Sequence, residues 1–168
     1  MVTTPGYPAY PNILKSIGLL PVTLPTGPQS RFQPTPAALS EVGTGVEGLI
    51  IASPANPTGT MLDFKALRSL ANYCNAQGIR LISDEVYHGI TYGHNSVSAV
   101  EVTDSAIVVN SFSKYYSMTG WRLGWMVVPQ ELIRSIEVLA QNLAISAPTL
   151  SQHAAISAFD STQELNQK

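Results

Sequence analysis

The chain has 168 residues, of which 45% are hydrophobic, a size and composition typical of one globular domain with its own core. Nine basic and eleven acidic residues give a net charge of −2 without any basic run, which argues against nucleic acid as a partner. No apolar stretch approaches the length of a membrane span, and the start MVTTPGYPAYP lacks the basic and apolar regions of a secretory signal.

The first half of the chain predicts two short helices and two strands. After a proline-rich start, residues 12–19 (NILKSIGL) carry apolar residues at helical spacing until Gly18, and residues 21–25 (PVTLP) read as a short strand. Residues 35–43 form the second predicted helix, with Thr35 as its cap. The strand at 46–53 (VEGLIIAS) has no polar alternation, so we expect it to be covered on both faces, as in a parallel sheet.

A longer helix is predicted over residues 64–77, with Asp63 as its cap and Gly78 as its left-handed C-terminal residue. One stripe of this helix is apolar and comprises Leu67, Leu70, Ala71 and Cys74. Cys74 is the single cysteine, so we expect it to pack in the core. A lone cysteine excludes an internal disulfide and fits a reducing compartment, which favours a cytoplasmic protein.

The second half of the chain continues the alternation of strands and helices. Strands are predicted at IRLIS (79–83), AIVVNSF (106–112) and RLGWMVV (122–128), and helices at 130–144 and 149–159. This order predicts an α/β fold, a three-layer α/β/α sandwich around a mostly parallel sheet.

Polar side chains follow three of the predicted strands at the point where each strand ends. They are Asn56 after the first, Asp84 with Tyr87 after the second, and Ser111, Ser113 and Lys114 after the third. Because ligands of open α/β sheets bind beyond the carboxyl ends of the strands, these groups are expected to converge there, together with Arg122.

Two other kinds of site fit this set poorly. His88 lies near Asp84, but His94 and His153 show no ligand-like spacing, so no metal site is predicted and His88 is expected to be a structural histidine. A serine hydrolase is disfavoured because no serine stands in a G-x-S-x-G motif.

A phosphorylated pyridine aldehyde matches the set better. A lysine amine forms an imine with the aldehyde, hydroxyls and a guanidinium hold the phosphate, and a carboxylate keeps the ring nitrogen protonated. A phenol and an amide that donate to the ring oxygen would hold it as an anion.

Four segments then resemble those of a known family: PGYPAYPNILKSIGLLPVTLP, ASPANPTGT, ISDEVYHGITYG and SFSKYYSMTGWRLGW. The chain resembles the fold-type I aminotransferases of class I and II, which depend on pyridoxal 5'-phosphate. A single S-x-S-K motif would be weak evidence for this family, whereas four similar segments in the same order are specific evidence.

The resemblance implies a role for each of eight residues. Lys114 would form the Schiff base and move the proton between the substrate's Cα and the cofactor. Asp84 would pair with the ring nitrogen, and Tyr87 and Asn56 would bond the ring oxygen. The phosphate would be bound by Ser111, Ser113 and Arg122. Tyr7 would stack on the ring.

The resemblance covers nearly the whole chain, but the chain would cover less than half of a family member. Residues 1–168 are therefore expected to be part of the large, cofactor-binding domain, without the family's N-terminal segment and C-terminal small domain. The low content of charged residues, 12%, fits strands and helices that pack on missing segments or on a second subunit. A homodimer is implied for the parent protein, and little activity for the chain alone.

Alternatives remain open from the sequence. The parent would transfer an amino group from an amino acid to a 2-oxo acid, but the same pocket supports carbon-sulfur lyase, β-elimination or decarboxylation chemistry in relatives. A non-catalytic interaction module is a third hypothesis. Residue by residue, Asp84 could cap a helix that begins at Glu85, and Ser111, Ser113 and the Asn56 segment could be turns.

Overall fold

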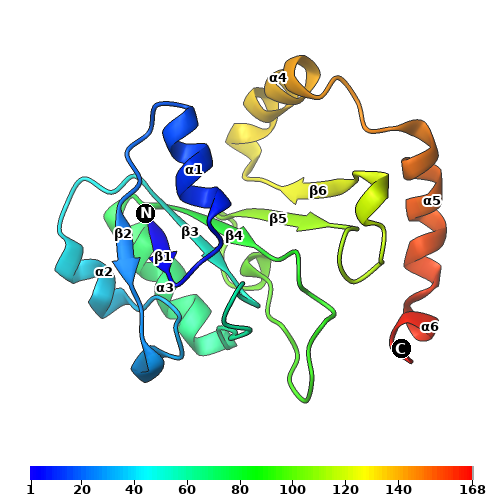
Figure 1. The fold of residues 1–168 in the computed structure, drawn as a ribbon. Coiled ribbons are helices and arrows are strands. Elements are labelled where there is room, and N and C mark those ends of the chain that lie inside the picture. Colours follow the sequence, from blue (N-terminus) through cyan, green and yellow to red (C-terminus); the bar gives the residue numbers. More distant parts are fainter. Residues whose placement is uncertain (168) are drawn as a thin grey trace.

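A computed structural model of the chain describes residues 1–167, which form a six-stranded sheet (Figure 1). Across the sheet the strands lie in the order β2 (Thr23–Pro25), β1 (Val2–Thr4), β3 (Gly48–Ala52), β4 (Arg80–Asp84), β5 (Ile107–Ser111) and β6 (Gly124–Val127). All neighbouring strands are parallel except β6, which runs antiparallel to β5. The predicted mostly parallel sheet is confirmed.

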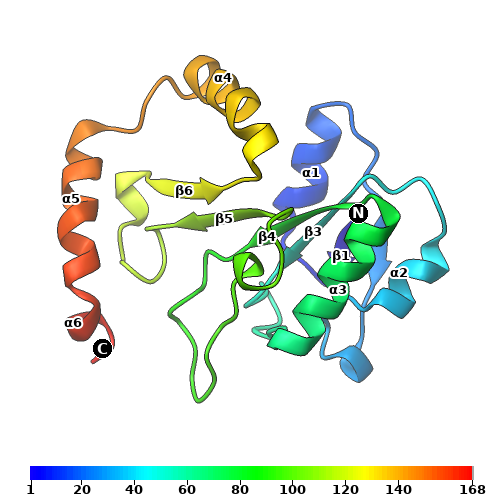
Figure 2. The same cartoon turned by 180° about the vertical axis from the view of Figure 1, so that it is seen from behind.

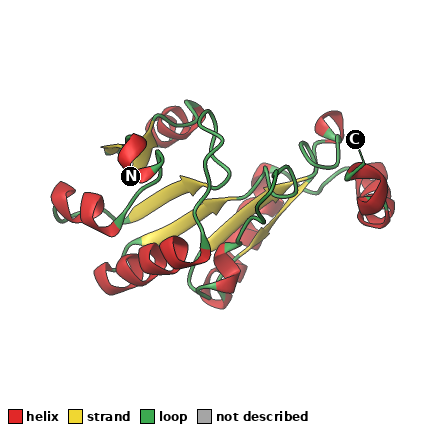
Figure 3. Cartoon of the chain, turned by 90° about the horizontal axis from the view of Figure 1, so that it is seen from below, coloured by secondary structure: helices red, strands yellow, loops and turns green. Residues whose placement is uncertain are grey.

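Helices lie on both faces of this sheet. The α-helices are α1 (Ala9–Ser16), α2 (Pro36–Val42), α3 (Phe64–Gln77), α4 (Ile133–Leu143), α5 (Thr149–Asp160) and α6 (Thr162–Leu165). Short 3₁₀ helices are η1 (Pro28–Ser30), η2 (Ala99–Glu101), η3 (Thr119–Trp121) and η4 (Gln130–Leu132). Figure 2 shows α3 in front of the sheet and α1 behind it, and Figure 3 shows the sheet between these two layers. The three-layer α/β/α arrangement is therefore confirmed.

Helix α3 forms as its sequence predicts, and it builds the core. The Asp63 carboxylate accepts a hydrogen bond of 2.8 Å from the Ala66 N–H at the start of the helix, and Gly78 ends the helix at a φ of 67°. The buried residues of the helix are those of the predicted stripe, Leu67, Leu70, Ala71 and Cys74. They pack against buried residues of β3, β4 and β5 in one hydrophobic cluster. Cys74 is free, and burial raises the pKa of its thiol to about 11.

Three local expectations differ from the structure. Helix α1 begins at Ala9, three residues before the predicted start, because Pro11 falls in its first turn, where proline is tolerated, and it ends at Ser16. Strand β1 was not predicted from the sequence, because three residues before a proline are too few for a recognisable alternation. Strand β3 is buried on one face, through Leu49 and Ile51, whereas Ile50 on the other face is half-buried. Helix α1 lies on that second face but contributes no buried residue, so it covers the face incompletely.

Aromatic side chains hold α5 against the end of the sheet. The Phe112 ring lies 5.0 Å from the Trp125 ring and 5.3 Å from the Phe159 ring, between centroids. Because Phe112 directly precedes Ser113 and Lys114, this packing anchors the segment that carries them. Within residues 1–167, no helix combines the length and apolar character needed to cross a membrane.

Candidate active site

The parallel strands bring their carboxyl ends to one edge of the sheet. In the register of the sheet, Asp84 at the end of β4 lies beside Ala52 at the end of β3 and beside Val109 in β5. The segments that follow these strands therefore emerge next to one another. Strand β1 is parallel too, and the chain that leaves it carries Tyr7 to the same edge.

The antiparallel strand β6 explains how Arg122 reaches this edge. Its first residue, Gly124, pairs with Ser111, the last residue of β5, so the chain enters β6 where β5 ends. Arg122 stands just before that entry. A Cβ at Gly124 would lie 2.6 Å from the Asn110 carbonyl oxygen, so the close approach of the strands requires glycine.

All eight residues expected from the sequence line a single cavity of about 340 Å³ at this edge. They are Tyr7, Asn56, Asp84, Tyr87, Ser111, Ser113, Lys114 and Arg122. The cavity thus combines an amine, a carboxylate, an amide, phenols, hydroxyls and a guanidinium. No expected site residue lies elsewhere among residues 1–167.

Both oxygens of the Asp84 carboxylate accept a hydrogen bond. Oδ1 accepts from the Val86 N–H at 3.1 Å, and Oδ2 accepts from the Tyr10 hydroxyl at 2.5 Å. The first bond belongs to the turn that follows β4, so the capping alternative was correct in part, although residues 86–89 form a turn and no helix. The second bond holds the carboxylate in the cavity wall.

Tyr10 also lines the cavity, although it is not among the residues predicted from the sequence. It stands on the first turn of α1, three positions after Tyr7, and the two rings meet edge to face at 5.5 Å. That spacing was the available signal, because residues three apart at a helix start share a face. Burial and then the hydrogen bond to Asp84 raise the pKa of the Tyr10 hydroxyl well above its ordinary value.

We expect Asp84→Asn to lower the pKa of Tyr10, while burial keeps it above that of an ordinary tyrosine. The neutral amide still accepts a hydrogen bond but no longer repels a phenolate. In the unchanged protein, the raised pKa contributes stability that is present below the ordinary tyrosine pKa and is lost as the pH rises toward the folded-state value. Titration of the Tyr10 ring carbons by NMR measures the shift, and identical curves for both proteins would contradict it.

Lys114 is exposed and extends into the cavity from the segment after β5. Its Nζ atom lies 5.7 Å from the centroid of the Tyr87 ring. The neighbouring Tyr115 ring packs on Gly89, where a Cβ would lie 2.5 Å from Cδ2 of the ring and where φ is +88°. Glycine at this position therefore lets the Lys114 segment approach the turn that carries Tyr87.

The two serines and Arg122 form a compact polar corner of the cavity. The Ser111 hydroxyl donates to the Ser113 hydroxyl at 2.9 Å and accepts from the Ser113 N–H at 3.0 Å. Arg122 donates one of its five N–H groups to the Thr119 carbonyl at 2.9 Å. This corner offers two hydroxyls and an exposed guanidinium, which are donors that suit a phosphate group.

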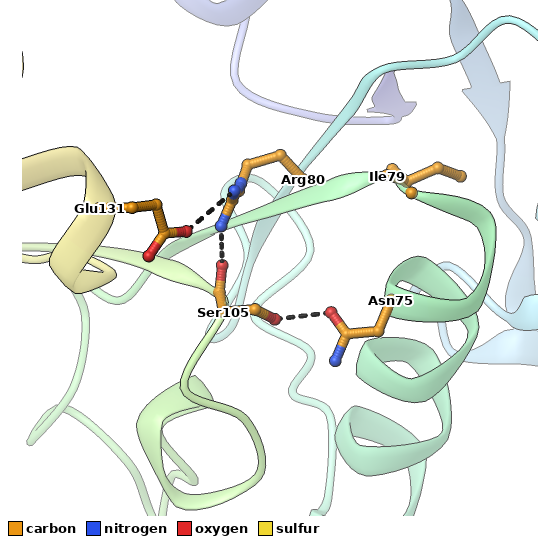
Figure 4. A pocket seen from close by; sticks show the side chains of 6 residues that line it. Asn75, Ile79, Arg80, Ser105 and Glu131 are labelled. Atoms are coloured by element: carbon orange, nitrogen blue, oxygen red, sulfur yellow. Dashed lines mark hydrogen bonds and ion pairs between the residues drawn. The ribbon is translucent and has the colours of Figure 1, made fainter.

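A second pocket lies at the opposite end of β4, and its polar groups are paired with each other (Figure 4). Arg80 donates to the Ser105 carbonyl at 2.6 Å and to Glu131 at 3.3 Å, and the Ser105 hydroxyl donates to Asn75 at 2.6 Å. These contacts join α3, β4, the segment before β5 and η4. The network fastens elements together and shares no residue with the cavity around Lys114. Nor does any group of three or more His, Cys, Asp or Glu side chains within residues 1–167 suit a metal ion.

Sequence comparison decides the family. The family described as aminotransferase class I and II matches residues 1–168. The chain belongs to the class I and II aminotransferase family. The family depends on pyridoxal 5'-phosphate, and the amine, the carboxylate, the hydroxyls and the guanidinium that line the cavity have the chemistry that this cofactor requires.

Individual aminotransferases are similar to nearly the whole chain. Valine–pyruvate aminotransferase of Mycobacterium tuberculosis is 51% identical over 94% of this chain and 41% of its own length. Aspartate aminotransferase of Geobacillus stearothermophilus is 34% identical over 98% of this chain and 43% of its own length. A crystal structure of an aminotransferase from Mycobacterium tuberculosis superposes with a TM-score of 0.94 at 49% identity, covering 99% of this chain and 44% of that one. The chain therefore spans less than half the length of these relatives.

Proposed function

We propose that this chain forms the cofactor-holding part of an enzyme that transfers an amino group from an amino acid to a 2-oxo acid. The observation that carries the proposal is the single cavity in which Lys114 and Asp84 meet the six other expected residues. When bound, pyridoxal 5'-phosphate would supply an electron sink for the charge that develops at the substrate's Cα.

Each side chain has a role that follows from its chemistry. The Lys114 amine would hold the cofactor through its aldehyde carbon and later move a proton from the substrate's Cα. Asp84, already fixed by Tyr10 and Val86, would keep a proton on the ring nitrogen. Tyr87 and Asn56 would donate hydrogen bonds to the ring oxygen.

The remaining expected residues would bind the other parts of the cofactor. Ser111, Ser113 and Arg122 would hold the phosphate by donating hydrogen bonds, the arginine through its planar fork. The exposed Tyr7 ring stands at the cavity wall, where it would cover one face of the pyridine ring.

Valine and pyruvate are the first substrates to test, because the chain is 51% identical to valine–pyruvate aminotransferase of Mycobacterium tuberculosis. Within residues 1–167 the cations that line the cavity are Lys114 and Arg122, and both have a proposed role toward the cofactor. The cations that would bind the carboxylates of a substrate are therefore not among the described residues of this lining.

We further propose that residues 1–168 are part of the large domain of a longer protein, and that this protein is a cytoplasmic homodimer. The length of the relatives supports the first point. The free, buried Cys74 is compatible with a reducing compartment. Half-covered strands such as β3 fit an assembly with further packing partners.

The test is to trap the cofactor on the chain. Purified protein is mixed with pyridoxal phosphate, its visible absorption is recorded, the mixture is reduced with borohydride and the labelled peptide is mapped by mass spectrometry. We expect a visible band and a label at Lys114, with none at Lys15 or Lys65. A label spread over the lysines in proportion to their exposure, or no band at all, would overturn the proposal.

A further inference from the structure

Glu85 and His88 belong to the segment that follows β4, and they stand next to the cavity residues Asp84 and Tyr87 in the sequence. Neither residue lines the cavity, whereas Asp84 and Tyr87 of the same segment do. The Glu85 side chain is 2% exposed and the His88 side chain 18% exposed. The two therefore form a polar pair, of which Glu85 is buried and His88 half-buried, next to the proposed cofactor-binding residues.

The Glu85 carboxylate is fixed by three hydrogen-bond donors. Oε1 accepts from the Ser83 hydroxyl at 3.0 Å and from the Ala99 N–H at 2.7 Å, and Oε2 accepts from the Ser98 hydroxyl at 2.7 Å. Burying a carboxylate is costly unless it is hydrogen-bonded in this way. Glu85 is consequently a rigid anchor that joins β4 to the segment before η2.

His88 connects this anchor to a different segment. Its Nδ1 atom lies 3.5 Å from Oε2 of Glu85, and its Nε2 atom lies 2.9 Å from the Ser53 carbonyl oxygen. A carbonyl can only accept a hydrogen bond, so Nε2 carries a proton and donates it. The imidazole thus bridges the turn that carries Tyr87 and the start of the 53–60 segment, which carries Asn56.

The 53–60 segment has other bonds, but they do not fix it to that turn. The Ala55 N–H donates to the Thr60 carbonyl at 3.0 Å and the Gly59 N–H donates to the Ala55 carbonyl at 2.7 Å, so both bonds stay within the segment. The Ser53 N–H donates to the Asp84 carbonyl at 3.2 Å and ties the segment to the end of β4. The buried Gln33 side chain donates to the Thr60 carbonyl at 2.9 Å and so holds the far end of the segment, away from the turn. Within residues 1–167, the hydrogen bond that links this segment to the turn beyond β4 is therefore that of His88.

We propose that His88 is a positioning residue that sets the placement of Asn56 relative to Tyr87, and so the two hydrogen bonds that these residues would donate to the ring oxygen of the cofactor. This inference rests on the proposed function. Hydrogen bonds to that oxygen favour its anionic form and lower the pH at which the Lys114 linkage loses its proton. Looser placement of the two donors would raise that pH.

The test compares His88→Leu, which removes the bridge, with His88→Gln, whose amide N–H has a reach similar to that of Nε2. His94→Leu makes the same change at an exposed histidine of the neighbouring loop and serves as the control. The first measurement needs no cofactor: hydrogen exchange of the Ala55 and Gly59 amides in folded protein. We expect faster exchange in His88→Leu and near-normal exchange in His88→Gln and His94→Leu.

The second measurement is the pH midpoint of the visible band with pyridoxal phosphate bound. We expect His88→Leu to move the midpoint to higher pH by about 0.5 to 1 unit, the size of a partly lost hydrogen bond. In an Asn56→Ala background the further shift should be much smaller, because the two changes act on the same contact. A merely structural histidine would lower the melting temperature and leave the midpoint in place.

The outcomes separate this inference from the proposed function. If the unchanged protein forms no band, the proposed function fails, and the exchange data alone decide whether His88 holds the 53–60 segment. Exchange rates or band midpoints that are unchanged in His88→Leu would overturn the inference. It would also be overturned if His88→Gln behaved like His88→Leu, because the bond to Ser53 would then not be the link that matters.

Discussion

Replacing Lys114 by alanine is expected to remove both the visible band and the borohydride-stable label completely. Within residues 1–167, Lys114 contributes the one amine that lines the cavity, and an imine cannot form without an amine. Absorbance titration with pyridoxal phosphate and peptide mapping measure the loss. The matched control is Lys65→Ala on the exposed face of α3, which should leave both signals unchanged.

A second replacement separates the charge of Lys114 from its covalent chemistry. Lys114→Arg keeps a cation that can lie over the Tyr87 ring, but a guanidinium remains protonated and does not attack the aldehyde. We expect this variant to lack the band and to bind more pyridoxal phosphate than Lys114→Ala does. A normal band in either variant would show that the cofactor is attached elsewhere.

The helices and strands that follow from local chemistry could be predicted from the sequence. In α3, the cap at Asp63, the apolar stripe and the stop at Gly78 depend on residues within one stretch of chain, so the sequence contains the whole signal. The cavity could be predicted because each of its main residues follows directly on a strand end. Knowing that the strands are parallel is then enough to bring Asn56, Asp84 and Lys114 together.

Features that depend on distant pairings could not be predicted in this way. The bond between Tyr10 and Asp84 joins residues 74 positions apart, and the bond between His88 and Ser53 joins residues 35 positions apart. Neither bond produces a periodic pattern in the sequence, because each depends on the order of the strands in the sheet. The sequence predicts a structural role for His88, and the bond of His88 to the Ser53 carbonyl agrees with it. The position of His88 between the segments that carry Tyr87 and Asn56 could not be predicted, because it depends on the fold.

Incomplete coverage of the sheet has the same origin. The apolar run in β3 predicts two covered faces, but the run cannot say which element covers the second face. In the described chain, α1 lies there without contributing a buried residue, and Ile50 stays half-buried. The apolar pattern reflects the surroundings of β3 in a complete protein. Because this chain spans less than half the length of its relatives, it does not contain every element expected to cover the strand.

Replacing Asp84 by alanine is expected to weaken the binding of pyridoxal phosphate by about 10- to 100-fold, the loss that corresponds to one hydrogen bond between charged partners. Asp84 would be the carboxylate partner of the ring nitrogen, and the same change leaves the Tyr10 hydroxyl and the Val86 N–H without their acceptor. Asp84→Asn keeps one carbonyl oxygen that can accept from the Val86 N–H, and its amide N–H can donate to the Tyr10 oxygen, but it has no charge for the ring. We therefore expect it to melt close to the unchanged protein and still to bind the cofactor weakly.

Asp63→Ala is the matched control, because Asp63 is a carboxylate that serves the fold alone. It caps α3 through the Ala66 N–H, so its loss should cost about 1 kcal/mol of stability while the cofactor binds as before. Equilibrium dialysis gives the affinities and thermal unfolding gives the stabilities of the three variants. Opposite effects in Asp63→Ala and Asp84→Asn would assign one aspartate to the helix and the other to the cofactor. If Asp84→Asn bound pyridoxal phosphate normally, Asp84 would belong to the turn and not to the site, and the ring nitrogen would need another partner.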